Sequence, residues 1–351
     1  MIYCFDLEGC KDCIGCAGLR KKQYCVFNEQ LSKKEYEDFK SKLNLCDPET
    51  RKKMKSELER LKLEIPHRYM QSLNVENASG NYVFQSKNAK NSYFTDRCED
   101  VAYCMQVVDL KDCCDNNYTE ENELCYEYLG AYRNQNLLFS MFCNKVSESY
   151  YSHSCHNSKN LFGCNAIRNG QYCILNKQYS KEEYEALVPR VIEHMKKTGE
   201  WGEFFSIENS IFGYNETVAN EYFPLTKEQA LKRGYKWRDD DESNAYQGPT
   251  PTIPDNISDI DDEILKQILK CEVSGKLYKI IPQELEFYRK MKLPIPHRCP
   301  NQRHKDRLAM RNPQILWDRL CQKCSTTIRT SYSPDRPEKV YCEACYLAEV
   351  Y

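Results

Sequence analysis

Four cysteines in the last part of the chain form the pattern with the most specific chemistry. Cys321 and Cys324 form one Cys-x2-Cys pair, Cys342 and Cys345 form another, and residues 325–341 separate the pairs. A Cys-x2-Cys turn places two thiolates on one metal ion, and Zn²⁺ takes four such soft ligands in a tetrahedron. Because four protein thiolates leave no position for a catalytic water, the pattern predicts one structural zinc site.

A second pattern upstream looks like the same kind of site with one cysteine of each pair replaced. Cys271 and Cys299 each stand alone, with a Ser or a Gln where the second ligand would be. His297 or His304 would complete a Cys2His2 set for a second Zn²⁺. The alternative interpretation is a ribbon that has lost its metal and kept its core.

The residues around these cysteines resemble known sequences. Residues 271–307 resemble the small family of probable zinc ribbons, in which a Cys pair and an aromatic-rich strand precede the motifs FYxxxxLxxP and RCPxCR. With the repeated QYC and SKEEYE units and the final VYCEACYLAEVY, nearly the whole chain resembles uncharacterised bacterial Cys-rich repeat proteins that end in a zinc ribbon. The resemblance implies an architecture and no particular activity.

The segment between the two intact Cys pairs must hold them together. Its residues alternate in character and are split by Pro334 and Pro337, which predicts a β-hairpin. The second pair then opens a short helix, CEACYLAEVY. A turn, a hairpin and a Cys pair at a helix start are the layout of a treble clef or zinc ribbon.

A short repeat fills much of the first half of the chain. Between residues 82 and 173, a pair of apolar or Cys residues such as Tyr103-Cys104 recurs at spacings of 10 to 13. Such units are too short for helical hairpins but suit stacked strands with Asn, Asp and Gly corners. Two units would make a coil of about 21 to 22 residues, so we expect a parallel β-solenoid. The alternative is an irregular Cys-rich loop region.

A longer duplication links residues 13–37 with residues 161–185. Both copies contain QYC and end in the S-x-x-E capping box, which predicts helix starts at Ser32 and Ser180. We therefore expect a mainly β protein with α insertions, built from β-solenoid-like arrays of 10-11-residue units and a C-terminal treble-clef module. The predicted segments are 1–30, the end of a first repeat array; 31–65, a helical insertion; 66–179, a second array; 180–237, a helical and aromatic capping segment; 238–263, an acidic Pro-containing linker; and 264–351, the zinc-ribbon module, degenerate over 271–302 and intact over 321–345. The repeat that starts at Met1 lacks a cap, which suggests self-association or further sequence upstream.

Composition narrows the class of protein. The 351 residues carry a formal net charge of -2 and include 21 Cys and 26 Tyr. Mean hydropathy is -0.76, and no apolar run approaches the roughly 18 residues of a membrane span. The first residues show neither the basic nor the apolar region of a signal peptide. An odd cysteine count without such a signal predicts a reduced, cytoplasmic protein with no membrane partner.

The repeat cysteines have two competing interpretations. They exchange with Tyr, Phe and Leu along the repeat, which favours small apolar core residues over metal or redox centres. Cys10, Cys13 and Cys16 imitate an iron–sulfur motif, but the duplicated copy has Leu at one position, so packing is favoured there too. The array cysteines are Cys98, Cys104, Cys113, Cys114, Cys125, Cys143, Cys155, Cys164 and Cys173.

Charge offers a second function. Residues 289–330 hold 11 Lys or Arg against two Asp, a net of +9. Basic zinc ribbons contact phosphate backbones, so nucleic-acid binding is one hypothesis; a solvated basic face is the other. The candidate contacts are Arg298, Arg303, Lys305, Arg307, Arg311 and Arg319.

No phosphate loop, nucleophile elbow or metalloprotease motif occurs, so we do not expect an enzyme. The leading hypothesis is a non-enzymatic, zinc-stabilised binding or scaffold protein that presents a Tyr/Cys-rich solenoid surface to a protein or nucleic acid. A redox or metal-handling protein that uses the array cysteines is the third hypothesis.

Overall fold

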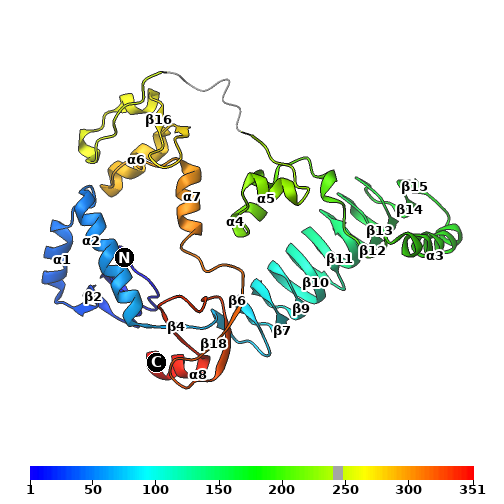
Figure 1. The fold of residues 1–351 in the computed structure, drawn as a ribbon, viewed down its shortest axis with the longest axis horizontal. Coiled ribbons are helices and arrows are strands. Elements are labelled where there is room, and N and C mark those ends of the chain that lie inside the picture. Colours follow the sequence, from blue (N-terminus) through cyan, green and yellow to red (C-terminus); the bar gives the residue numbers. More distant parts are fainter. Residues whose placement is uncertain (240–247) are drawn as a thin grey trace.

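The computed structural model describes residues 1–239 and 248–351 and shows a mixed α/β protein in which sheets predominate (Figure 1). The α-helices of the described residues are α1 (Lys33–Lys42), α2 (Pro48–Glu64), α3 (Lys181–Thr198), α4 (Ala219–Tyr222), α5 (Lys227–Lys232), α6 (Pro282–Met291), α7 (Pro300–Leu308) and α8 (Glu343–Val350).

The strands of the first half form two stacks, and short strands of the C-terminal part form three two-stranded sheets, one of them with β4 (Pro66–Arg68). The first stack (residues 2–30) contains β1 (Lys11–Ile14), β2 (Gln23–Val26) and β3 (Glu29–Gln30). The second stack (residues 72–178) contains β5 (Ser72–Leu73), β6 (Gly80–Phe84), β7 (Lys87–Lys90), β8 (Ser92–Asp96), β9 (Glu99–Ala102), β10 (Met105–Glu123), β11 (Tyr126–Met141), β12 (Asn144–Tyr150), β13 (His156–Phe162), β14 (Gln171–Ile174) and β15 (Lys177–Gln178). The C-terminal strands are β16 (Leu269–Lys270), β17 (Leu277–Tyr278), β18 (Trp317–Leu320), β19 (Thr327–Thr330) and β20 (Lys339–Tyr341).

Neighbouring strands in both stacks pair in parallel, and almost all partners are separated by the same step along the chain. Cys13 pairs with Cys25 in the first stack, and Cys114 pairs with Tyr126 in the second, so the step is 12. The hairpins that end each stack, β2–β3 and β14–β15, are antiparallel. The prediction that two repeat units form one coil is therefore wrong. Strand partners are 12 residues apart, so one coil contains 12 residues.

The step of 12 arises from a unit of three residues. A left-handed residue (positive φ) recurs at every third position from Tyr3 to Phe27 and from Tyr82 to Leu175. Inside the stacks, the residue that follows such a position points inward: Arg97 has φ +53° and Cys98 is 2% exposed. Each left-handed residue turns the chain, so four units bring it back above its own starting point.

The interior of the second stack is narrow and takes one small side chain per unit. Its buried cluster consists of Cys, Val, Leu and Ala residues with one large side chain, Tyr128. Eight of the nine array cysteines are buried, as core packing requires, whereas Cys114 is exposed because it follows an inward residue. Cys13 and Cys16 are likewise buried inside the first stack.

Helices cover the far end of each stack, as the duplication predicts. Both capping boxes are present, at the start of α1 and of α3, and α2 begins at Pro48. Tyr36 of α1 packs against Ile14, and Tyr184 of α3 packs against Ile174. The two copies therefore share an ending as well as a sequence.

The acidic segment is only partly a linker. Residues 240–247 lie outside the described residues, so the prediction cannot be compared there. Ile253, Ile257 and Ile260 are buried and pack in one cluster with Leu269 and Cys271. The second half of the predicted linker is thus part of a core that includes Cys271, because its isoleucines pack there.

The left-handed corners can be tested at Lys145, an exposed residue with φ +54°. A left-handed conformation costs a residue with a Cβ about 1–2 kcal/mol and glycine almost nothing. We expect Lys145→Gly to stabilise the protein by about 1 kcal/mol and Lys145→Val to destabilise it by a similar amount, in guanidinium unfolding followed by circular dichroism. The control is Lys159, which is exposed in β13 and has no positive φ. There we expect the Gly substitution to destabilise the protein and the Val substitution to stabilise it. If each substitution changed the stability in the same direction at Lys145 and at Lys159, the role of the left-handed corners would be contradicted.

Candidate metal centre

The two intact Cys pairs meet in one cluster. The sulfur atoms of Cys321, Cys324, Cys342 and Cys345 all lie within 4.8 Å of one another. The backbone N–H of Cys342 donates to the Cys321 sulfur at 3.2 Å, and the sulfurs of Cys324 and Cys342 are 3.7 Å apart. Four soft donors at this spacing fit a tetrahedral metal ion, so this group can hold one.

Within the cluster, the pKa values of the thiols are shifted in both directions. A hydrogen bond from the Thr326 hydroxyl, together with its backbone N–H, lowers the pKa of Cys324 to about 6. The pKa of Cys345 is raised to about 12, chiefly because its thiol is hydrogen-bonded to Cys324 and also because it is desolvated. The crowded sulfurs thus hold their protons unequally, and a bound cation would displace the protons that remain.

The strands that carry the cluster differ from the sequence prediction. The segment between the pairs does not fold into a hairpin on itself: β19 pairs with β18, which precedes the first pair, and β20 leaves to pair with β4. The prediction was wrong because it considered only the residues between the pairs. The short helix at the second pair is confirmed as α8, with Cys342 at its N-cap.

The cluster is thereby tied to the chain between α2 and the second stack. Strand β20 pairs in parallel with β4, and Arg68 forms an ion pair with Glu343 of α8. His67 is 5% exposed; its Nε2 lies 2.7 Å from the Lys62 carbonyl oxygen and its Nδ1 3.1 Å from the Tyr332 hydroxyl. Because a carbonyl only accepts, Nε2 carries the proton and Nδ1 accepts from Tyr332.

Contacts also reach both stacks, and Figure 1 shows the C-terminal segment (red) between them. The Asn81 side chain of β6 donates to the Ser331 hydroxyl at 3.1 Å. On the other side, the Tyr346 hydroxyl of α8 lies 3.1 Å from an Asp6 carboxylate oxygen and accepts from Arg20 at 2.7 Å. These residues were not singled out in the sequence, and no local signal could have found them, because each partner is at least 250 residues away along the chain.

The upstream module repeats the backbone of the intact one. Lys270 pairs with Leu277 just as Leu320 pairs with Thr327 in the intact module. The same N–H···O bonds close both turns, at Cys271 and at Cys321. Where the intact module has sulfur ligands, the upstream one has Ser274, whose hydroxyl lies 3.6 Å from the Cys299 sulfur, and Gln302, which bonds to Asp306.

The two histidines are not brought to this upstream position. His297 Nε2 lies 3.8 Å from an Asp255 carboxylate oxygen, and His304 Nε2 lies 3.1 Å from Glu221. Within residues 1–239 and 248–351, no second set of three or more Cys, His, Asp or Glu ligand atoms gathers as the four C-terminal sulfurs do. The described residues therefore do not form the Cys2His2 set of Cys271, Cys299, His297 and His304.

Most of the predicted nucleic-acid contacts have partners within the chain. Arg298 forms ion pairs with Glu272 and Asp306, and Arg303 with Glu284. Arg311 donates to the Tyr222 hydroxyl and lies over Phe94, and Arg319 donates to the Ser333 carbonyl. Lys305 and Arg307 make no side-chain bond to the part of the chain that the structure describes. Four of the six candidate contacts thus have partners within the described chain, but only Arg298 and Arg303 form ion pairs.

Comparisons with known proteins add no identity: no protein-family model and no curated protein sequence matches this chain. The resemblance to probable zinc ribbons therefore remains a prediction, supported in the structure by the four-cysteine cluster alone. No helix in the described ranges has the length and apolar character needed to cross a membrane.

Removing the metal should loosen the joint between the two stacks. In the metal-loaded protein, we expect a chelator to raise amide hydrogen exchange at β4 and around Asp6, because β20 and α8 lose the metal ion that fixes them. Strand β12, far from the cluster, serves as the internal control and should stay protected. Unchanged exchange at β4 would show that the contacts hold without metal.

The upstream module should regain a metal site when its ligands are restored. Because the backbone of both modules is the same around the turns, we expect Ser274→Cys with Gln302→Cys to bind about one additional zinc ion per chain, measured by elemental analysis. The control is Glu272→Cys with Asn301→Cys, which adds two thiols beside the ligand positions and should bind none. Equal zinc content in the two variants would contradict the proposed equivalence of the modules.

Proposed function

We propose that this chain is a non-enzymatic, zinc-stabilised scaffold in which two short β-solenoids are joined by the four-cysteine module. Four cysteines are a donor set typical of structural zinc, and they leave no ligand position for a substrate or water. Buried free thiols beside such a site suit a reducing, cytoplasmic environment.

A single observation carries the proposal: the four-cysteine module bonds to both stacks. Its Ser331 contacts Asn81 of the second stack, and its Tyr346 contacts Asp6 and Arg20 of the first. A metal that holds β20 and α8 together also fixes these contacts. Zinc would therefore set the position of the two stacks relative to each other, which is a structural role.

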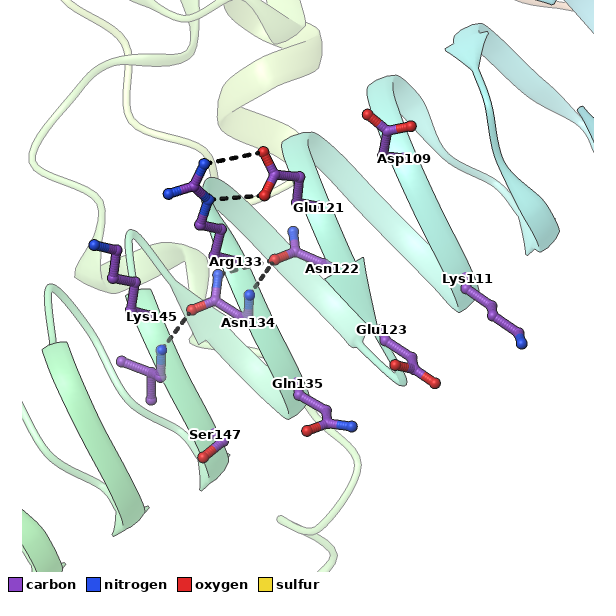
Figure 2. A pocket seen from close by; sticks show the side chains of 11 residues that line it. Asp109, Lys111, Glu121, Asn122, Glu123, Arg133, Asn134, Gln135, Lys145 and Ser147 are labelled. Atoms are coloured by element: carbon purple, nitrogen blue, oxygen red, sulfur yellow. Dashed lines mark hydrogen bonds and ion pairs between the residues drawn. The ribbon is translucent and has the colours of Figure 1, made fainter. Parts of the chain in front are cut away.

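The second stack supplies the binding surface in this proposal. Figure 2 shows one of its sides, a shallow hollow of about 580 Å³ lined by polar and charged residues. Arg97 pairs with Asp109 at 2.7 Å, and Arg133 pairs with Glu121 at the same distance. The buried Asn122 and Asn134 bond to each other beneath them at 3.0 Å. The chain therefore holds these charges in fixed rows, one step of the stack apart.

The balance of charge on this side favours a protein partner. The lining holds three acidic residues and three basic ones: Asp109, Glu121, Glu123, Lys111, Arg133 and Lys145. A polyanion such as nucleic acid gains from a one-signed surface, whereas a mixed and fixed pattern complements another protein and excludes wrong partners. The internal ion pairs of Arg298 and Arg303 also weaken the case for nucleic acid.

The test is charge reversal on this side. We expect the full-length protein, immobilised with zinc bound, to retain a defined set of proteins from an extract of its own cells, and Lys111→Glu with Lys145→Glu to lose that set. Lys177→Glu with Lys181→Glu, at the far end of the stack, is the matched control and should keep it. Retention of nucleic acid that falls steeply with salt and depends on Lys305 and Arg307 would overturn the proposal. So would a set of proteins unaffected by either variant.

A further inference from the structure

The interior of the first stack consists mostly of thiols. Cys4, Cys10, Cys13, Cys16 and Cys25 form one cluster with two leucines. Three of these cysteines are buried, whereas Cys4 and Cys10 are partly exposed. The proposed scaffold function uses none of these five thiols.

The step of 12 places these thiols one above the other in pairs. Cys13 and Cys25 are register partners, and the bridges Ile2–Ile14 and Phe5–Ala17 set Cys4 over Cys16 in the same way. The Cys4 thiol donates to the Ile2 carbonyl oxygen at 3.3 Å, and the Cys16 thiol donates to the Ile14 carbonyl oxygen at the same distance, so the two side chains take the same orientation one step apart. Adjacent strands lie about 4.8 Å apart, so each pair offers two sulfurs that face one another.

Backbone donors in the first stack resemble those of the C-terminal cluster. The N–H of Asn28 donates to the Cys16 sulfur at 3.4 Å, and the N–H of Lys22 donates to the Cys10 sulfur at 3.4 Å. The corresponding bond at the C-terminal cluster, to Cys321, is 3.2 Å. Such N–H···S bonds stabilise a thiolate relative to a thiol and so assist the loss of a proton on metal binding; Cys98 of the second stack accepts one as well.

The number of sulfur atoms that lie together determines which metal ion the first stack could bind. The described residues bring three or more ligand atoms together only at the C-terminal cluster, so the first stack does not form a four-coordinate zinc site. Two facing thiolates are a complete ligand set for a soft monovalent ion, and among biological metals Cu(I) is the one that thiolates select. The partly exposed Cys4 gives such an ion a route to the pair.

We propose that the stacked pair of Cys4 and Cys16 is a binding site for Cu(I), held between the two sulfurs, with Cys13 and Cys25 beside it. On binding, two S–H bonds break, two Cu–S bonds form and two protons leave to solvent. No electron is transferred, since the ion arrives and stays as Cu(I). The inference is independent of the proposed scaffold function.

The test is a Cu(I) titration of the zinc-loaded, full-length protein without oxygen, against the chelator bicinchoninate. We expect Cys4→Val with Cys16→Val to lower the copper capacity by about one ion per chain. The control is Cys143→Val with Cys155→Val, a thiol pair of the second stack that lies in register in the same way and in which both residues are 0% exposed. Its capacity should stay unchanged. Valine suits these positions because Val107 and Val146 already occupy inward positions of the second stack.

Three results would overturn the proposal. The first is an unchanged capacity in the Cys4 and Cys16 variant, and the second is an equal loss in both variants. The third is release of zinc in step with copper uptake, which would place the copper at the C-terminal cluster. X-ray absorption of the copper-loaded wild-type protein tests the site without any substitution: two sulfur neighbours are expected, and three or four would contradict the geometry.

Discussion

The left-handed residue at every third position is the constraint on which this fold depends. Each one costs conformational energy for a side chain with a Cβ, and from Tyr82 to Leu175 the series has no gap. Parallel hydrogen bonding between successive turns of the chain offsets that cost, because every turn places its strands directly beside those of the turn before. Without these corners no inward position would lie above another, and neither stack would have an interior.

The narrow interior explains the unusual composition. An inward position has room for Cys, Val, Ser or Asn, and a large side chain such as Tyr128 is the exception. A thiol is small and apolar, so it fits there without a metal. Cysteine therefore serves two purposes in one chain: it fills the stacks, and at the C-terminus it forms a cluster of sulfurs that can hold a metal ion. In the first stack, the thiols that fill the interior also lie together in one cluster, where they could bind a metal ion.

The C-terminal cluster takes its importance from its position. The module that carries the cluster contacts both stacks and β4 and so connects them. The upstream module keeps the same turns with only two of the four sulfurs, and its core also contains isoleucines and Cys46, which lies between α1 and α2. One backbone design thus appears twice, once with a complete set of sulfur donors and once held together by apolar packing.

The sequence by itself determined what depends on near neighbours. The capping boxes at Ser32 and Ser180 start helices, and the two Cys-x2-Cys pairs gather in one cluster. The period of three is also present in the sequence, since Cys98, Cys104, Cys113 and Cys125 differ by multiples of three, but the apolar pairs at spacings of 10 to 13 mask it. Tertiary structure alone decided that β20 joins β4, that the isoleucines of the acidic segment are buried, and that Tyr346 meets Asp6. Those contacts join surfaces that lie far apart along the chain, and their free energy comes from complementarity that no local pattern encodes.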